Sequence, residues 1–378
     1  MLFQLLALRN RFTYIRQMRR VLTFFLCFYG FIALSAQHGA VATVDPLATD
    51  AAVQVMKKGG NAIDAAVAAG LTLGVVNGYN SGIGGGCFIV ARLSNGRVIT
   101  INGRETAPAK AHRDMYLRNG KPDTGLSQIG PLASGVPGAL AAYAQLAKAH
   151  GKLPLRVHLE TAATVAEKGF AIPAAYAGRI RATAKGLAKF PASGALFLKA
   201  DGSPKVAGNL LKQPDLARTY RAIAKEGTGW FYGGPFARKT ELWMKNNGGI
   251  LAARDFTNYK TTSPPPVRTT YRGHTILGMQ PPSSGGVHVA QILNILEHFD
   301  LAKMDSDSAD FYHVITEAMK LAFADRAHWL GDPAFAKVPR GLVDKAYAKQ
   351  LAARIRLDRA TPVKTHGTPP RSTDNLYS

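Results

Sequence analysis

The sequence has 378 residues, of which 47% are hydrophobic, so the chain is long and apolar enough to bury a large core. This composition excludes a disordered tail and a small disulfide-held scaffold. Its 47 lysines and arginines outnumber its 24 acidic residues, and the net charge of +23 favours attraction to anionic surfaces or substrates. The alternative is a generally basic exported protein with solvated side chains. The basic residues are spread along the chain without a nucleic-acid-binding motif, so we expect no nucleic-acid partner.

The first 36 residues differ in composition from the rest. Arginines between Arg9 and Arg20 precede an apolar run over residues 21–34, which is short for a membrane span, and Ser35 and Ala36 follow. We interpret residues 1–36 as a cleaved signal peptide and expect an exported protein, periplasmic or secreted. The alternatives are an uncleaved N-terminal anchor and a true start at Met18.

The chain has two cysteines, and Cys27 lies in the predicted signal peptide. No disulfide within the processed chain is therefore expected. Cys87 opens a strand-like apolar run, which indicates a buried structural thiol in preference to a nucleophile.

Two helices are predicted near the start of the processed chain. Asp45 and Pro46 are typical of a helix start, and Gly59-Gly60 marks its end. Asn61 is the expected cap of a second helix that runs to about Val76. This second helix has almost no polar face, so we expect it to be buried on all sides.

A glycine-rich loop at residues 82–86 leads into a predicted hairpin, with strands at 88–93 and 98–101 joined by a turn at 94–96. The loop precedes a strand, which does not fit a dinucleotide or P-loop fingerprint. It indicates close backbone packing or an array of N–H groups near a ligand.

The remaining elements alternate along the chain. We expect helices at about 138–150, 161–168, 286–296, 309–329 and 344–355, a β-rich segment at 267–279 that turns at 271–274, and surface elaboration at 186–214. The apolar face of the helix at 286–296 is expected to comprise Val289, Ile292, Leu293 and Leu296. From residue 359 the composition cannot pack a core. With no internal repeat, the pattern predicts one layered α/β or α+β domain.

The sequence does not support a serine nucleophile or a metal site. The serine nucleophile motif G-x-S-x-G is absent, and Ser134 and Ser284 are interpreted as helix caps. His313 and Glu317 have the spacing of two ligands on one helix face, but no second cluster completes a metal site, so a solvated pair is expected. Asp325-Arg326 is interpreted as an ion pair or surface feature. We predict no metal and no cofactor.

Arg104 is the candidate binding residue, because it directly follows a predicted strand and lies close in sequence to the glycine loop. A guanidinium offers a rigid fork of donors that matches a carboxylate. The alternative is a structural salt bridge between Arg104 and Glu105.

Six segments, in order, resemble the large subunit of γ-glutamyltransferases, also called γ-glutamyltranspeptidases or glutathione hydrolases. They occur at residues 59–66, 84–88, 104–108, 135–138, 281–286 and 324–333, and the resemblance covers roughly residues 39–356. It implies an α+β fold, the N-terminal-nucleophile hydrolase αββα sandwich, with helical elaborations in the large-subunit part. It also implies a domain at 37–358 and a flexible tail at 359–378 that leads to the autoprocessing site.

The same resemblance implies an enzyme made as a proenzyme. The γ-glutamyl group of glutathione or another γ-glutamyl amide passes to a threonine at the start of the small subunit, and then to water or to an amino-acid or peptide acceptor. That threonine is expected beyond Ser378, so no catalytic residue is assigned in this chain. Arg104 matches the substrate-carboxylate arginine, and the small subunit of the same proenzyme is the expected partner.

One departure concerns Gly103, where many relatives carry a bulky aromatic residue. The chain also stops about where the large subunit ends. Two alternatives therefore stay open: a glutaryl-β-lactam (cephalosporin) acylase of the same fold, in which Arg104 holds a glutaryl carboxylate, and an inactive fragment that lacks the nucleophile.

Overall fold

The computed structural model describes residues 39–370, and the predicted signal peptide lies outside the described residues. The helices of eight or more residues are α2 (Pro46–Lys57), α3 (Ala62–Val76), α5 (Ala139–His150), α6 (Leu155–Lys168), α7 (Ala174–Leu187), α9 (Pro214–Glu226), α11 (Pro235–Asn246), α13 (Ser284–Leu296), α14 (Ala309–Trp329) and α15 (Lys345–Ala352). Shorter helices are α4 (Thr124–Gln128), α8 (Pro191–Phe197), α10 (Gly229–Tyr232) and α12 (Ala253–Asn258), with short 3-10 turns at Pro131–Ala133, Leu301–Lys303 and Arg340–Val343. None of the described helices is both long and apolar enough to cross a membrane.

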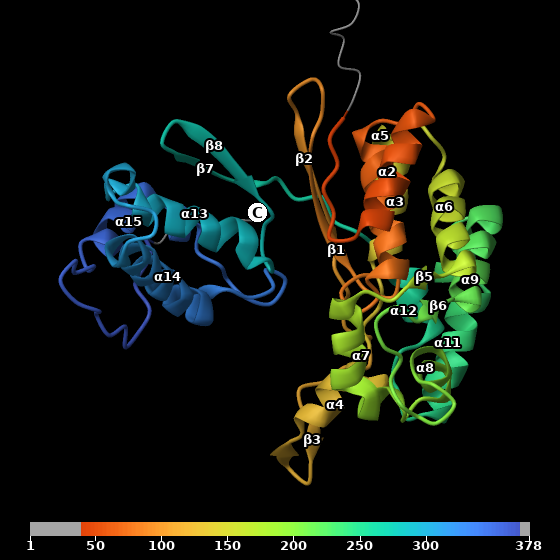
Figure 1. The fold of residues 1–378 in the computed structure, drawn as a ribbon. Coiled ribbons are helices and arrows are strands. Elements are labelled where there is room, and N and C mark those ends of the chain that lie inside the picture. The colour runs from red at the N-terminus through yellow and green to blue at the C-terminus, as the bar shows by residue number, and fades with distance from the viewer. Residues whose placement is uncertain (1–38, 371–378) are drawn as a thin grey trace, which may run out of the picture. The chain divides into compact units, whose positions relative to one another are not determined.

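The strands between residues 39 and 370 pair two by two, all antiparallel (Figure 1). The pairs are β1 (Cys87–Arg92) with β2 (Val98–Gly103), β3 (Leu117–Arg118) with β4 (Lys121–Pro122), β5 (Phe170–Ala171) with β6 (Leu210–Leu211), and β7 (Val267–Tyr271) with β8 (His274–Gly278). Both predicted hairpins, β1–β2 and β7–β8, are confirmed within one or two residues. The tight β7–β8 turn uses Arg272 and Gly273, both with positive φ.

The first two predicted helices form as their caps indicate. The Asp45 carboxylate accepts the Leu47 N–H at 2.9 Å at the start of α2. The Asn61 side chain caps α3, and the Asn61 N–H donates to the Asp64 carboxylate, which completes a capping box. Apart from exposed alanines in its first turn, α3 is buried or half-buried along its length, so the predicted burial is largely confirmed.

The structure differs from the sequence prediction in the middle of the chain. Residues 174–258 contain α7 to α12, where the sequence analysis predicted only surface elaboration over part of this range. Several of these helices begin at a proline without a side-chain cap. Their stability therefore depends on packing against the core, which includes Tyr220, Phe231 and Phe256.

Asp64 is a buried polar group beside the hydrophobic core formed by α3, α5, α6 and their neighbours. Its carboxylate accepts backbone N–H groups from Asn61 (2.9 Å), Lys152 (2.8 Å) and Leu153 (3.1 Å), and it lies 3.1 Å from His158 Nε2. Both Asp64 and His158 are fully buried. The carboxylate thus joins the start of α3 to the turn between α5 and α6.

A second hydrophobic cluster gathers α13, α14 and α15. The predicted apolar face of α13 is partly wrong, because Val289 is exposed, whereas the polar side chains of His288, Gln291 and Asn294 are buried. Gln291 donates to Asp325, and Asn294 donates to the Val343 carbonyl. Polar partners from neighbouring elements thus stabilise a buried face of α13 that differs from the apolar face predicted from the sequence.

The segment after α15 has neither helix nor strand over residues 359–370 but is hydrogen-bonded to α14. The Thr361 N–H donates to Glu317 at 3.2 Å, and Lys320 donates to the Thr361 carbonyl at 2.7 Å. The Gly367 N–H donates to Asp325 at 2.6 Å. The described part of this segment is therefore anchored, and the flexible tail at 359–378 stays a prediction.

Candidate functional site

Arg104 lies immediately after β2 and is half exposed. Its backbone N–H donates to Asn102 Oδ1 at 3.0 Å, and its Nε donates to Glu105 Oε2 at 3.0 Å. Among the described residues, its two terminal nitrogens have no hydrogen-bond partner. The salt bridge expected as an alternative therefore exists, yet it leaves the end of the guanidinium available to a carboxylate.

Tyr259 fixes the backbone of Arg104 from a distant part of the chain. Its hydroxyl donates to the Arg104 carbonyl at 2.8 Å. The guanidinium also lies over the Phe88 ring, with Cζ 5.4 Å from the ring centroid. Sequence reasoning missed Tyr259, because nothing in the sequence signals a contact across 155 positions.

The glycine loop packs its backbone directly against the strand that carries Arg104. A Cβ on Gly86 would lie 2.7 Å from the Arg104 Cα and 2.6 Å from the Gly103 carbonyl oxygen, so any side chain there would displace the strand. The Gly85 carbonyl accepts the N–H groups of Gly138 and Ala139 at the start of α5. The predicted role in close backbone packing is thus confirmed.

Gly103 is equally constrained by its surroundings. A Cβ at this position would lie 2.5 Å from the Ala142 Cβ on α5 and 3.2 Å from the Gly138 carbonyl oxygen. Helix α5 therefore fills the space that an aromatic side chain would need. This close approach of α5 to β2 explains why the chain has glycine at position 103, where many relatives carry a bulky aromatic residue.

Two cavities meet at Glu105. One, of about 340 Å³, is bordered by Arg104, Glu105, Tyr259 and Lys260, and the other, of about 470 Å³, is bordered by the glycine loop and Glu105. Two cations, Arg104 and Lys260, and two carboxylates, Glu105 and Asp332, thus border the first cavity. It can accept an anionic group at Arg104 and a cationic or donor group near Glu105.

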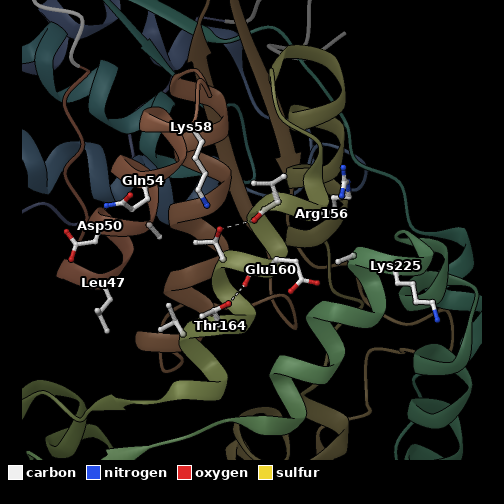
Figure 2. A pocket seen from close by; sticks show the side chains of 13 residues that line it. Leu47, Asp50, Gln54, Lys58, Arg156, Glu160, Thr164 and Lys225 are labelled. Atoms are coloured by element: carbon white, nitrogen blue, oxygen red, sulfur yellow. Dashed lines mark hydrogen bonds between the residues drawn. The ribbon is translucent and has the colours of Figure 1, made fainter.

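A wider groove of about 840 Å³ lies among α2, α6 and α9 (Figure 2). The hydroxyls of Thr161 and Thr164 that line it are bonded to carbonyls of their own helix, each at 2.8 Å. Its charged groups, among them Lys58 and Glu160, project from separate helices (Figure 2). This groove holds neither Arg104 nor the glycine loop, so we place the candidate site at Arg104.

Cys87 begins β1 and is half-buried. Burial, together with the negative charge of Glu105, raises the pKa of the Cys87 thiol to about 11. The thiol is therefore protonated at neutral pH, which agrees with the predicted structural role and not with a nucleophile.

Neither of the two serines predicted as helix caps has that role in the structure. Ser283 is the residue that caps α13, and its Oγ accepts the Gly285 N–H at 3.1 Å, whereas Ser284 is the first residue of the helix. Ser134 makes no cap, because α5 begins after Gly138. Consecutive serines offer the same cap signal, so sequence alone does not distinguish them.

The two predictions on α14 are wrong about exposure. Glu317 is buried and bonded to Lys320 at 2.5 Å, while His313 contacts the Arg356 carbonyl at 2.7 Å, so they form no solvated pair. Asp325 is fully buried and accepts from Gln291, Tyr347 and Gly367. It is therefore a structural acceptor and not an ion-pair partner of Arg326.

Within residues 39–370, no group of three or more histidine, cysteine, aspartate or glutamate side chains could hold a metal ion.

Comparison with known proteins gives consistent results. Residues 48–376 match the γ-glutamyltranspeptidase family model. The chain is 41% identical to the glutathione hydrolase proenzyme of Escherichia coli over 335 residues, 88% of this chain and 58% of the relative. It is also 41% identical to the acylase ACY 1 proenzyme of Pseudomonas sp. strain SE83 over 334 residues, 86% of this chain and 60% of the relative.

A solved structure extends the similarity to the fold. The crystal structure of Helicobacter pylori gamma-glutamyltranspeptidase matches with a TM-score of 0.83 at 39% identity, covering 86% of this chain and 93% of that one. The predicted α+β N-terminal-nucleophile hydrolase fold class is thereby confirmed. The chain spans about three-fifths of the length of the two curated relatives, both of which are named proenzymes. On the family match and these similarities, the chain belongs to the γ-glutamyltranspeptidase family.

Proposed function

We propose that this chain provides the substrate-carboxylate site of a γ-glutamyltransferase that hydrolyses or transfers the γ-glutamyl group of glutathione and related amides. Arg104 binds the α-carboxylate of the γ-glutamyl group. The observation that carries the proposal is the geometry of Arg104, which borders a cavity and whose Nε is bonded to Glu105 while both terminal nitrogens are without a partner among the described residues.

The reaction needs a nucleophile that we assign to the rest of the proenzyme, as the resemblance implies. The hydroxyl oxygen of its N-terminal threonine attacks the γ-carbonyl carbon, the C–N bond breaks, and the departing amine takes up a proton. Water or an acceptor amine then attacks the ester and releases the threonine. Arg104 contributes by holding the far end of the glutamyl group, so that the γ-carbonyl is positioned for attack.

The proposed partner is the small subunit of the same proenzyme, and the relatives support it because both are named proenzymes. Strand β1 pairs only with β2 among the described strands, so its outer edge offers free backbone donors and acceptors. Val90 on β1 is exposed, which suits coverage by a further protein segment. We propose that the assembled enzyme is exported.

An acylase acting on glutaryl-β-lactams is the second candidate, favoured by the equal identity to the acylase ACY 1 proenzyme. Arg104 would serve the terminal carboxylate of either acyl group. A glutaryl group lacks the α-amino group, so the two functions differ in what lies opposite the carboxylate.

The test uses protein expressed from its whole reading frame and compares γ-glutamyl-4-nitroanilide with glutaryl-4-nitroanilide. Arg104→Lys should raise KM for the γ-glutamyl substrate about ten- to a hundredfold, because a charge-assisted bond contributes roughly 1.5 to 3 kcal/mol. Arg92→Lys on the exposed end of β1 is the matched control and should leave KM unchanged. Unchanged kinetics in Arg104→Lys would exclude Arg104 as the carboxylate site. Faster cleavage of the glutaryl anilide would favour the acylase.

A further inference from the structure

Helix α7 carries a row of unpaired cations. Arg181, Lys185 and Lys189 are exposed and are spaced by four residues, which places them along one face of the helix and its C-terminal extension. Helix α7 contains no acidic residue, and none of the three cations takes part in an ion pair with another described residue. Like charges at this spacing destabilise a helix, so fold stability does not account for the row.

The excess of positive charge extends beyond the helix. Residues 170–213 contain seven lysines and arginines but one acidic residue, Asp201. Asp201 is bonded to the Ser203 beside it, through both the backbone N–H and the hydroxyl. It is therefore already engaged locally, and the segment as a whole presents an almost uniformly positive charge to its partners.

Exposed apolar side chains lie close to α7 and its C-terminal extension. Ile129 and Trp243 are 46% and 43% exposed. A Cβ on Gly186 of α7 would lie 3.6 Å from Ile129 Cδ1, and the Phe190 and Trp243 ring centroids are 6.5 Å apart. These contacts join α7, the end of α4 and α11 into one surface. We define the α7 patch as Ile129, Arg181, Lys185, Lys189, Phe190 and Trp243.

We propose that the α7 patch binds the surface of a membrane that contains anionic phospholipid. The cations suit lipid phosphates, and a half-exposed tryptophan suits the boundary between headgroups and acyl chains. A soluble polyanion would be matched by the cations alone and gives no role to Trp243 or Ile129. This surface is separate in sequence from the Arg104 site, so the inference goes beyond the proposed enzymatic function.

The experiment measures hydrogen exchange of the full chain with vesicles of phosphatidylcholine alone or with phosphatidylglycerol added. We expect residues 181–190 to become protected only with the anionic vesicles. In the triple variant Arg181→Glu, Lys185→Glu and Lys189→Glu, the lipid concentration for half-maximal protection should rise about a hundredfold or more, since each basic residue contributes about fivefold at an anionic surface. Because the readout is local to α7, contacts made by other parts of the chain do not produce it.

A matched control carries the same change in charge elsewhere. Lys57→Glu, Lys148→Glu and Lys349→Glu alter three exposed lysines on α2, α5 and α15. This variant should lose much less protection than the α7 triple variant, and both variants should keep the unfolding midpoint of the wild type within a narrow range. Equal loss in the two variants would assign the effect to net charge and overturn the proposal.

A second comparison distinguishes lipid from a soluble polyanion. Trp243→Ala should weaken protection by anionic vesicles severalfold and leave protection by heparin unchanged. Protection by vesicles of phosphatidylcholine alone would overturn the assignment to anionic lipid. The assignment would also be overturned if heparin protected as strongly as anionic vesicles and Trp243→Ala did not weaken protection by the vesicles.

Discussion

Replacing Asp64 with alanine tests how far one buried carboxylate stabilises the fold. The carboxylate accepts three backbone N–H groups and lies 3.1 Å from the buried His158 ring. Hydrogen bonds to a charged group contribute roughly 1.5 to 3 kcal/mol each, but their deletions are not additive. Removing one partner of a buried charged network typically costs about 3 to 5 kcal/mol. Because whole domains are stable by about 5 to 15 kcal/mol, Asp64→Ala should remove a large share of the total.

Urea unfolding followed by circular dichroism at pH 7.5 measures this change. The expected result is a lower midpoint with an unchanged slope, since the surface exposed on unfolding is nearly the same. Asp201→Ala is the control, because Asp201 is exposed and bonded only to its neighbour Ser203. If the midpoint of Asp64→Ala matched that of Asp201→Ala, the reasoning from buried donors would be refuted.

The same site predicts how stability depends on pH. Burial alone would raise the pKa of Asp64, but the N–H groups of Lys152, Asn61 and Leu153 outweigh it and hold the pKa below its usual value. Burial also lowers the pKa of His158, despite the nearby carboxylate. In each case the unfolded chain binds a proton more readily than the folded one. The free energy of unfolding therefore decreases as the pH is lowered. The loss should begin below about pH 6.5 through His158 and increase below about pH 4 through Asp64.

Three further predictions concern the surroundings of Arg104. Tyr259→Phe removes one hydrogen bond to the Arg104 carbonyl, worth about 1 kcal/mol, and should raise KM for a γ-glutamyl anilide about fivefold. Gly103→Ala places a Cβ against Ala142 and should lower stability by about 1 to 3 kcal/mol in urea unfolding, with partial recovery in the double variant with Ala142→Gly. Cys87 should react slowly with iodoacetamide in the folded protein at pH 8, because its pKa is raised to about 11.

Each of these has a result that contradicts it. Tyr312→Phe on the exposed side of α14 is the control for the tyrosine, and equal effects of the two substitutions would remove the positioning role of Tyr259. Additive losses in the Gly103 and Ala142 variants would show that the two positions are not in steric conflict. Thiol modification at the rate of a free cysteine would contradict the raised pKa of Cys87.

The sequence predicts well those elements whose ends are marked chemically. Asp45, Asn61 and Gly96 each supply a cap or turn that depends on near neighbours, and the structure forms α2, α3 and the β1–β2 hairpin there. Helices α7 to α12 carry weaker marks, since several have a proline at their start but no side-chain cap. Packing against residues far away in the chain decides these helices, and a local pattern does not contain that information.

The candidate site also contains some features that the sequence predicts and others that only the fold reveals. Arg104 and the glycine loop are visible in the sequence, because the arginine directly follows a predicted strand and the glycine run directly precedes one. Their supports are not visible, since Tyr259 and Ala142 reach the site only through the fold. The burial of Asp325 was missed for a related reason: its partners lie on three other segments, and an Asp-Arg pair in sequence is equally typical of an exposed helix.

The bond between Arg104 and Glu105 has a consequence for affinity through conformational entropy. A freely rotating arginine side chain loses about 1.5 to 2 kcal/mol of rotamer freedom when it is immobilised by a ligand. Here the Nε bond to Glu105 and the contact with the Phe88 ring already restrict that side chain before any ligand arrives. A carboxylate that binds Arg104 therefore meets a side chain much of whose ordering has occurred during folding, and retaining even 1.4 kcal/mol would tighten binding about tenfold.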